Sequence, residues 1–221
     1  MFIPTLDPIN ITGKTITADA LLTQKKIATY LVQREADYLF TVKANQATLL
    51  ADIVKFFENR QEPEYHTIDS DHGRIDKRSI WTTSEMNDYI EFPHVGQVFC
   101  IHRRSVDKKS GKVSEHTFYG VTSLTTDQAD AAKVLKIHRD HWTIENSSHH
   151  ILDNTYNEDK STIRTGHGPA NTTRLRRFAI GLLKSRGVKD VAQKLRDLHQ
   201  KTRMVFDYLG MTKNSRKIVG C

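Results

Sequence analysis

The spacing of apolar and polar positions changes along the chain and divides it into regions of different expected structure. Residues 15–18 are β-prone, residues 24–34 have a short helical period, and residues 37–43 form a strongly β-prone run. This strand–helix–strand spacing favours a parallel pair of strands in an α/β layer. Residues 46–59 follow with the pattern of another amphipathic helix.

Residues 61–125 have a different character, because short β-prone segments recur in them. These segments are residues 77–83, 97–103 and 115–123, and residues 107–111 make a natural hairpin turn. The pattern predicts an antiparallel, β-rich insertion.

From residue 127 onward the period becomes helical. A helix is predicted to begin at residue 126 or 127 and to run through residue 137, with a continuation to residue 152. Isoleucines at 137, 144 and 151 form its expected core stripe, and Glu145 falls beside that stripe, together with His138, His141 and Trp142. An ordinary amphipathic helix with a solvated Glu145 explains the same pattern.

Two more helices are expected near the C-terminus. Pro169 opens the first, at a position where a missing backbone N–H costs nothing. The second covers residues 188–200. The core stripe predicted for the first of these helices recurs at three- and four-residue spacing and consists of Leu175, Phe178, Ala179, Leu182 and Leu183.

Charge is unevenly distributed in this chain of 221 residues with a net charge of +7. Residues 174–217 contain thirteen Lys and Arg against Asp190, Asp197 and Asp207. Such an excess indicates a polyanionic partner, and a solvated helical surface is the alternative interpretation. No apolar run approaches the length of a membrane helix, the first residues lack a secretory pattern, and two distant cysteines favour a reducing compartment.

Two isolated carboxylates are the candidates for chemistry. Asp19 ends the first β-prone run, and Glu145 lies far downstream in the helical stretch of residues 137–146. A strand-end Asp and a distant helical Glu can meet in space and hold divalent metal for phosphodiester chemistry. A zinc site built from His138, His141 and His149 is a weaker alternative, because no open-site motif accompanies these histidines.

An ordered series of short motifs carries a family resemblance over about residues 14–210. The motifs, in chain order, are Thr17-Ala-Asp19-Ala, Val42-Lys-Ala-Asn-Gln46, Asp71-His-Gly-Arg74 through Arg78, His141-Trp-Thr-Ile-Glu-Asn146, His149-His-Ile-Leu-Asp153, Glu158-Asp-Lys-Ser-Thr-Ile-Arg164 and Pro169-Ala-Asn171 with Arg176-Arg177. The series resembles the C-terminal portion of bacterial insertion-sequence DDE transposases of the ISAs type, which include H-repeat-associated proteins.

The resemblance implies an α/β (α+β mixed) fold, namely an incomplete ribonuclease-H-like catalytic fold with a β-rich insertion and a helical C-terminus. The expected divisions are residues 1–60 as the partial core with the second catalytic Asp, residues 61–125 as the insertion, and residues 126–221 as the helical part with the catalytic Glu and basic helices. The implied reaction is metal-dependent DNA cleavage and strand transfer during transposition.

The resemblance also implies roles for single residues. Asp19 and Glu145 would be catalytic residues and ligands of Mg²⁺ or Mn²⁺, since these hard cations prefer carboxylate oxygens. Transposon ends and target DNA would be the partners, with a homo-oligomer in the bacterial cytoplasm near the nucleoid and no membrane. The expected DNA contacts are Lys43, Asn45, Arg74, Arg164, Arg174, Arg176 and Arg177. Helix capping by Asn45, a surface turn around Gly73 and structural ion pairs of the arginines are the alternatives.

One expected partner is missing from the series. The family's first catalytic Asp belongs on an earlier strand, and Asp7 is too close to Asp19 for the intervening strands to fit. We therefore expect a truncated transposase that is inactive alone. The alternatives are a non-catalytic DNA-binding remnant and an unrelated metal nuclease that takes a third carboxylate from Asp153, Glu158 or Asp159.

Overall fold

The computed structural model describes the chain except for residues 1, 72, 145–149 and 214–221. The chain divides into two compact units, Met1–His141 and Trp142–Cys221. No helix in the described ranges is long and apolar enough to cross a membrane.

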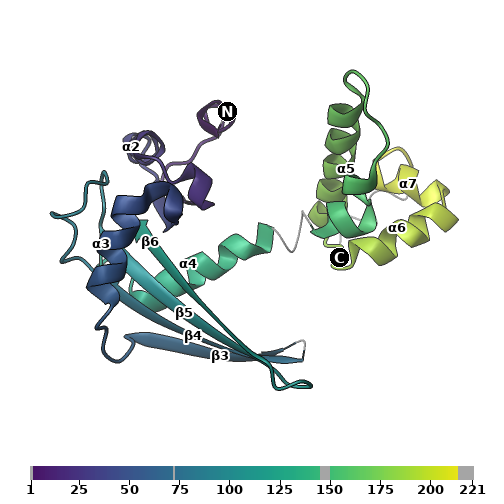
Figure 1. Ribbon diagram of the computed structural model, residues 1–221. Helices are drawn as coiled ribbons and strands as arrows, with labels where there is room; N and C mark the ends of the chain where they lie inside the picture. Colours follow the sequence, from purple (N-terminus) through teal and green to yellow (C-terminus); the bar gives the residue numbers. More distant parts are fainter. Residues whose placement is uncertain (1, 72, 145–149, 214–221) are drawn as a thin grey trace. The chain divides into compact units, whose positions relative to one another are not determined.

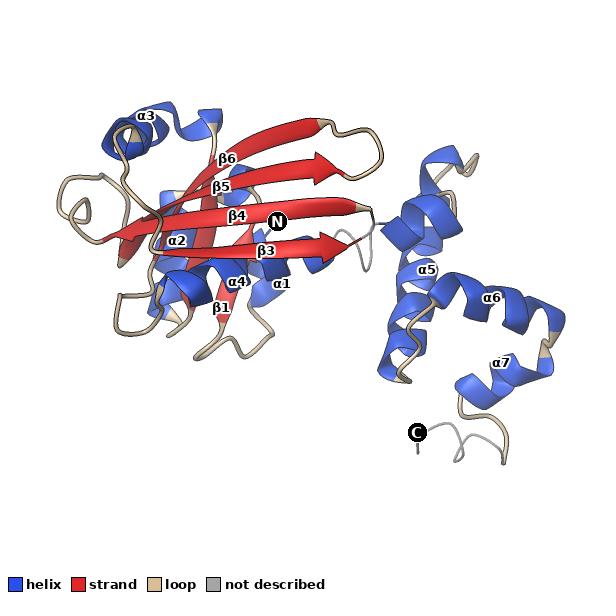
Figure 2. Ribbon diagram, turned by 90° about the horizontal axis from the view of Figure 1, so that it is seen from below, coloured by secondary structure: helices blue, strands red, loops and turns tan. Residues whose placement is uncertain are grey.

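The first unit is built on one six-stranded sheet with the order β1-β2-β6-β5-β4-β3. Only β1 and β2 are parallel, and every other neighbouring pair is antiparallel. Figures 1 and 2 show how the four long strands β3–β6 lie side by side. The strands are β1 (Thr15–Ala18), β2 (Asp37–Val42), β3 (Tyr65–Asp71), β4 (Arg74–Thr83), β5 (Gln97–Asp107) and β6 (Val113–Thr122).

The predicted strand–helix–strand unit is confirmed. Helix α2 (Lys25–Gln33) connects β1 to β2, which pair in parallel from Thr15 opposite Asp37 to Ala18 opposite Phe40. The helix forms here because Ile27, Ala28 and Leu31 recur on one face, and that face is buried against the sheet.

The predicted antiparallel character of residues 61–125 is also confirmed. The hairpin turn between β5 and β6 lies where the sequence places it, and Gly73 has the left-handed backbone expected for the turn between β3 and β4 (φ +75°). These strands continue the sheet of β1 and β2, because β6 pairs with β2 from Leu39 opposite Thr122 to Val42 opposite Tyr119. The domain boundaries at residues 60 and 125 remain predictions.

The two faces of the sheet have separate hydrophobic cores. Helices α1 (Phe2–Leu6), α2 and α3 (Ala47–Phe57) pack on one face, over Phe40 and Val98. Helix α4 (Ala131–Ile144) packs on the other face, over Leu39, Phe99 and Ile101. We call this second surface the α4 face and the first the opposite face.

A glycine marks the tightest contact in this sheet. A Cβ added at Gly120 would meet the Phe99 ring and would lie 2.5 Å from the carbonyl oxygen of Phe40. The close approach of β6 to its neighbours therefore requires glycine at this position.

The buried stripe of α4 differs from the predicted one. Its centre is formed by Val134, Leu135 and His138, with Ile137 packed at its edge. His138 was grouped with Glu145 beside the seam, but it is buried between the rings of Phe99 and Phe118. Burial lowers the pKa of His138 to about 4, and the charges of His141 and Arg78 act in the same direction.

The second unit is helical, as predicted. It contains the short helix η4 (Ile151–Thr155), the 3-10 turn η5 (Glu158–Lys160), α5 (Gly168–Ser185), α6 (Val191–Gln200) and α7 (Arg203–Tyr208). Pro169 lies in the first turn of α5, and the Asp190 side chain caps α6 by accepting a hydrogen bond from the Gln193 N–H (2.8 Å).

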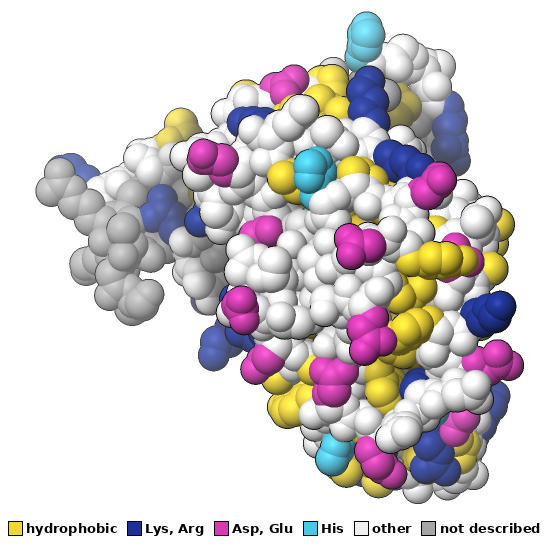
Figure 3. All heavy atoms as spheres, turned by 90° about the vertical axis from the view of Figure 1, so that its left-hand side faces the viewer, with side chains coloured by type: hydrophobic (Ala, Val, Ile, Leu, Met, Phe, Trp, Pro, Cys, Tyr) yellow, Lys and Arg dark blue, Asp and Glu magenta, His cyan; other side chains and the backbone are white. Residues whose placement is uncertain are grey.

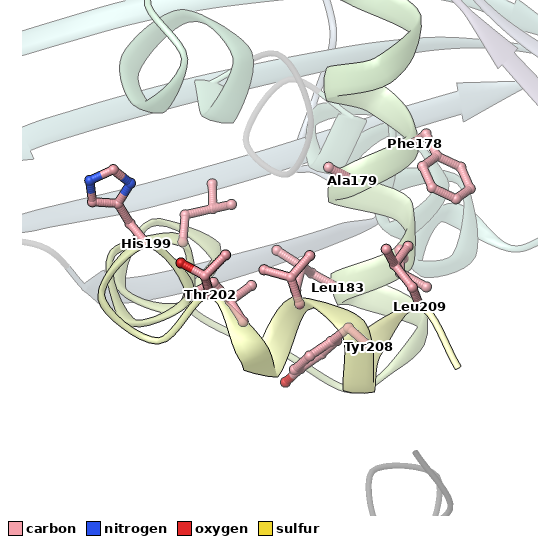
Figure 4. A pocket seen from close by; sticks show the side chains of 11 residues that line it. Phe178, Ala179, Leu183, His199, Thr202, Tyr208 and Leu209 are labelled. Atoms are coloured by element: carbon pink, nitrogen blue, oxygen red, sulfur yellow. The ribbon is translucent and has the colours of Figure 1, made fainter. Parts of the chain in front are cut away.

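The core stripe predicted for α5 is wrong in its first half. Leu175 and Phe178 are exposed, whereas Ile180 and Leu183 are buried. The reason is that α6 and α7 pack on the C-terminal part of α5 through Val191, Leu198 and Tyr208. Figure 4 shows residues that line an open apolar pocket between α5, α6 and α7, with a volume of about 510 Å³.

Candidate active site

Asp19 and Lys43 lie at the carboxyl ends of two neighbouring parallel strands. Asp19 directly follows β1, and Lys43 directly follows β2. Because the two strands run in the same direction, both residues reach the same edge of the sheet, where ligands of parallel α/β layers commonly bind. The Nζ of Lys43 lies 3.4 Å from the Oδ1 of Asp19.

The surroundings of Asp19 keep its carboxylate ionised. Its Oδ1 accepts a hydrogen bond from the Ala20 N–H (2.7 Å), and this bond lowers the pKa of Asp19 most. Partial burial acts in the opposite direction, but the charges of Lys43 and His141 add to the lowering. Within the described part of the chain, its Oδ2 makes no hydrogen bond or ion pair, so this oxygen is free to bind a cation.

The loops that follow β1 and β2 are fastened to each other by side-chain amides. Asn45 donates from Nδ2 to the Ala20 carbonyl (2.7 Å), and Gln46 donates from Nε2 to the Thr23 carbonyl (2.9 Å). The side chain of Asn45 therefore does not cap α3, because its amide donates to the Ala20 carbonyl. Its position next to Ala20 helps to hold the Asp19 loop in place.

Helix α4 contacts the strand that carries Asp19. The Nδ1 of His141 lies 3.0 Å from the Oγ1 of Thr17, two residues before Asp19. The sequence placed His141 on the same arc as Glu145 but did not identify Thr17 as its partner. Thr17 belongs to the motif Thr17-Ala-Asp19-Ala, and no other feature of the sequence pointed to Thr17. Glu145 itself lies outside the described residues.

The described residues do not complete a metal centre. No group of three or more His, Cys, Asp or Glu side chains converges among them. Asp19 nevertheless suits a hard divalent cation, because it is an ionised, exposed carboxylate whose Oδ2 has no partner among the described residues.

The arginines predicted to contact DNA have two kinds of surroundings. Arg176 is mostly buried: it lies 3.6 Å from Glu158 and over the Tyr156 ring. These contacts match the structural alternative for Arg176. The remaining four are exposed, namely Arg74, Arg164, Arg174 and Arg177.

The fold and site together define a mixed α/β protein with an acidic residue at the end of a parallel strand pair. Comparison with known proteins identifies the family within this broad structural class. The family described as "Transposase DDE domain" matches residues 1–180, so the chain belongs to that family.

Two curated relatives from Escherichia coli agree with this assignment. The chain is 30% identical over 196 residues to "Putative transposase YncI" of strain O157:H7, covering 84% of the chain and 49% of the relative. It is 30% identical over 189 residues to "H repeat-associated putative transposase YhhI" of strain K12, covering 80% and 49%. The chain spans about half the length of these relatives.

Proposed function

We propose that the chain takes part in metal-dependent DNA cleavage and strand transfer, with Asp19 and Glu145 as ligands of Mg²⁺ or Mn²⁺. One observation carries the proposal: His141, four residues before Glu145, contacts Thr17, two residues before Asp19. The sequence neighbours of the two carboxylates are therefore in contact within the first unit. We further propose that the sheet represents part of a ribonuclease-H-like core.

The roles of the residues follow from their chemistry. Asp19 would bind the cation through Oδ2 while the Ala20 N–H holds Oδ1 in place. A divalent ion at this position would activate an attacking oxygen and stabilise the leaving oxygen of a phosphodiester. The Lys43 ammonium, 3.4 Å from Asp19, would neutralise the carboxylate before the cation binds and would then turn to a DNA phosphate.

A second candidate function is DNA binding without catalysis. Residues 142–221 contain 15 basic and 7 acidic residues, whereas residues 1–141 contain 18 and 19. The cationic excess of the chain therefore lies in its helical unit, where the exposed Arg164, Arg174 and Arg177 are available for phosphate. Such binding requires neither Asp19 nor Glu145.

The experiment is a titration of the full chain with Mn²⁺, followed by electron paramagnetic resonance. The variants are Asp19→Asn and Glu145→Gln, and Asp88→Asn is the control because Asp88 is an exposed carboxylate of the same unit. Weak binding that both site variants abolish and the control retains would support the proposal. Metal binding that survives both site variants would contradict it.

A parallel measurement separates the two candidate functions. The affinity for a duplex DNA is determined with Mg²⁺ and with EDTA at constant ionic strength. Metal-dependent affinity that Glu145→Gln removes favours the catalytic role. Affinity that depends on salt but not on metal or on Asp19 favours DNA binding without catalysis.

A further inference from the structure

Part of the opposite face of the sheet is not covered by a helix of the first unit (Figure 2). Helices α1–α3 pack where that face is formed by β1, β2 and the adjoining ends of β5 and β6. Toward the hairpin turns, the same face of β3–β6 is open, and Figure 2 shows no helix of the first unit in front of it. Its exposed positions include His66, Lys77, Arg104 and Thr117.

Two cations lie directly opposite each other on this open face. Lys77 of β4 is the register partner of Arg104 of β5. Like charges in this position are unfavourable for a sheet, by a few tenths of a kcal/mol to about 1 kcal/mol. Glu115 lies 3.3 Å from Arg104 and compensates that residue, and Lys77 makes no ion pair within the described part of the chain.

The arginine pair on the α4 face differs, because it shares an acidic partner. Arg78 and Arg103 are also register partners, but Asp76 accepts hydrogen bonds from both of them (3.0 and 2.8 Å). The charges on that face are thus satisfied inside the protein. The opposite face leaves its cationic pair incompletely compensated.

The hairpin turns extend the cationic surface. The Lys108 N–H donates to the Gly73 carbonyl (2.8 Å), so the turns after β3 and β5 lie side by side. Lys108, Lys109 and Lys112 are exposed there. Asp107 at the same turn keeps its negative charge, because its Oδ1 accepts hydrogen bonds from Lys109 N–H, Ser110 N–H and Ser110 Oγ, and it offsets one of these three cations. We call Lys77, Arg104, Lys108, Lys109 and Lys112 the cationic strip.

The strip is a local concentration rather than a general property of the first unit. Residues 1–141 have 18 basic and 19 acidic residues and are therefore close to neutral. Figure 3 shows a face on which Asp and Glu side chains are spread among apolar ones.

We propose that the cationic strip binds the phosphate backbone of a nucleic acid. The inference rests on the proposed function and adds a second contact surface, outside the Asp19 site and the helical unit. From Arg104 to Asp107, three residues of extended strand span roughly 10 Å, and the turn with Lys108 and Lys109 follows. This length corresponds to about three phosphates along one strand of a duplex. The helical unit is itself cationic and is therefore not the ligand of this surface. His66 flanks the strip on β3 and has a ring N–H, whereas the Nε2 of His102 lies 3.6 Å from the Glu115 carboxylate.

The test compares two variants that lose the same charge. The strip variant is Lys77→Gln with Arg104→Gln, and the control is Lys26→Gln with Lys55→Gln, two exposed lysines on α2 and α3. The affinity of the full chain for a fluorescent duplex DNA is measured by anisotropy between 50 and 200 mM salt. At about 0.1 M salt, loss of two phosphate contacts should weaken binding between about tenfold and fiftyfold and should lower the salt slope by about 1.8.

A third variant predicts a change of opposite sign. Glu115→Gln removes the carboxylate that compensates Arg104 and should tighten DNA binding severalfold. A strip variant indistinguishable from the control would overturn the inference and leave the proposed function intact. Wild-type chain that binds no DNA at all would overturn both. Displacement of the DNA by polyglutamate at equal charge would overturn the assignment to nucleic acid.

A footprint on the unmodified chain provides a measurement that does not depend on the folding of variants. Lysine acetylation is followed by mass spectrometry with and without DNA. Protection of Lys77 and Lys109 relative to Lys26 and Lys55 is the expected result. Equal reactivity of all four lysines in saturating DNA would contradict the proposal.

Discussion

Asp76 links Arg78 and Arg103 on the α4 face, and its removal should lower the free energy of unfolding. Its carboxylate accepts hydrogen bonds from Arg78 Nη2 (3.0 Å), Arg103 Nη2 (2.8 Å), Arg103 Nε (3.2 Å) and the Ser105 hydroxyl. The side chains of Asp76 and Arg78 are only 16% and 14% exposed. Asp76→Ala would leave two arginines directly opposite each other without their shared partner.

The magnitude follows from this geometry. Removing one partner of a buried ion pair typically costs 3–5 kcal/mol, because the other charge is left without compensation. Arg103 is 29% exposed and Arg78 keeps its contact with Asp69 (2.7 Å), so we expect the lower end, about 3 kcal/mol. Asp88→Ala, at an exposed carboxylate, should change stability by less than about 0.5 kcal/mol.

Hydrogen exchange of the amides of β4 and β5 is the suitable assay, because a chain of two units need not unfold in one step. Asp76→Ala should lower the protection of these amides by about 3 kcal/mol. Asp76→Leu combined with Arg78→Met and Arg103→Leu should recover most of the loss, since well-packed apolar residues can replace a buried ionic cluster. A loss below about 1 kcal/mol in the single variant would refute the reasoning.

The same network predicts a pH dependence with a definite sign. Burial opposes ionisation of Asp76, but the hydrogen bonds from Arg103 and Ser105 and the charges of Arg103 and Arg78 outweigh it and lower the pKa. The contribution of Asp76 to stability is therefore complete above the pKa of an unfolded Asp, about 3.9. It is lost as the pH falls through the lower value of the folded protein.

Three further predictions concern single positions. His138→Phe should remove most of the loss of stability at acid pH. Because the pKa of His138 is about 4 in the folded protein, the wild type loses on the order of 3 kcal/mol of stability as the pH falls from about 6.5 to 4. Urea titrations at several pH values test this difference. Gly120→Ala should destabilise by several kcal/mol through collision with its neighbours, whereas Gly181→Ala, with open space in α5, should stabilise by about 0.5–1 kcal/mol; thermal unfolding that moves both in one direction would contradict this. Lys43→Met should raise the Mn²⁺ affinity of Asp19 up to about fivefold, because an exposed ion pair contributes at most about 1 kcal/mol, and an unchanged affinity by calorimetry would show that Lys43 does not compete with the cation.

The local elements of the fold could be predicted because they depend on neighbouring residues. The β-prone run in 37–42, the helical period in 25–33 and the turn at 107–111 each encode their structure within a few positions. The pairing of β2 with β6 could not be predicted, because it joins residues about eighty positions apart. No periodicity within either strand specifies that partner.

The same limit applies to the candidate site: a single residue could be identified from the sequence, but its contacts could not. Asp19 was identified because a polar residue at the end of a short strand is visible in the sequence. The partners of Asp19 were not visible: no pattern in the sequence joins Lys43 to Asp19 or Asn45 to the Ala20 carbonyl, and the DNA contacts expected of Lys43 and Asn45 remain predictions. On α5, the predicted stripe failed at Leu175 and Phe178, because burial there depends on how far α6 and α7 reach.

The two adjacent basic pairs of the sheet illustrate what alternation alone leaves undecided. Lys77-Arg78 and Arg103-Arg104 read identically as surface charge in the sequence. A strand sends neighbouring side chains to opposite faces, so each pair is divided, and the antiparallel register then aligns Arg78 with Arg103 and Lys77 with Arg104. Only the first of these aligned pairs has an aspartate between its members. The register therefore separates cations that share a mostly buried aspartate from cations on the open face of the sheet, and the variants that distinguish them must be chosen by strand face rather than by position in the sequence.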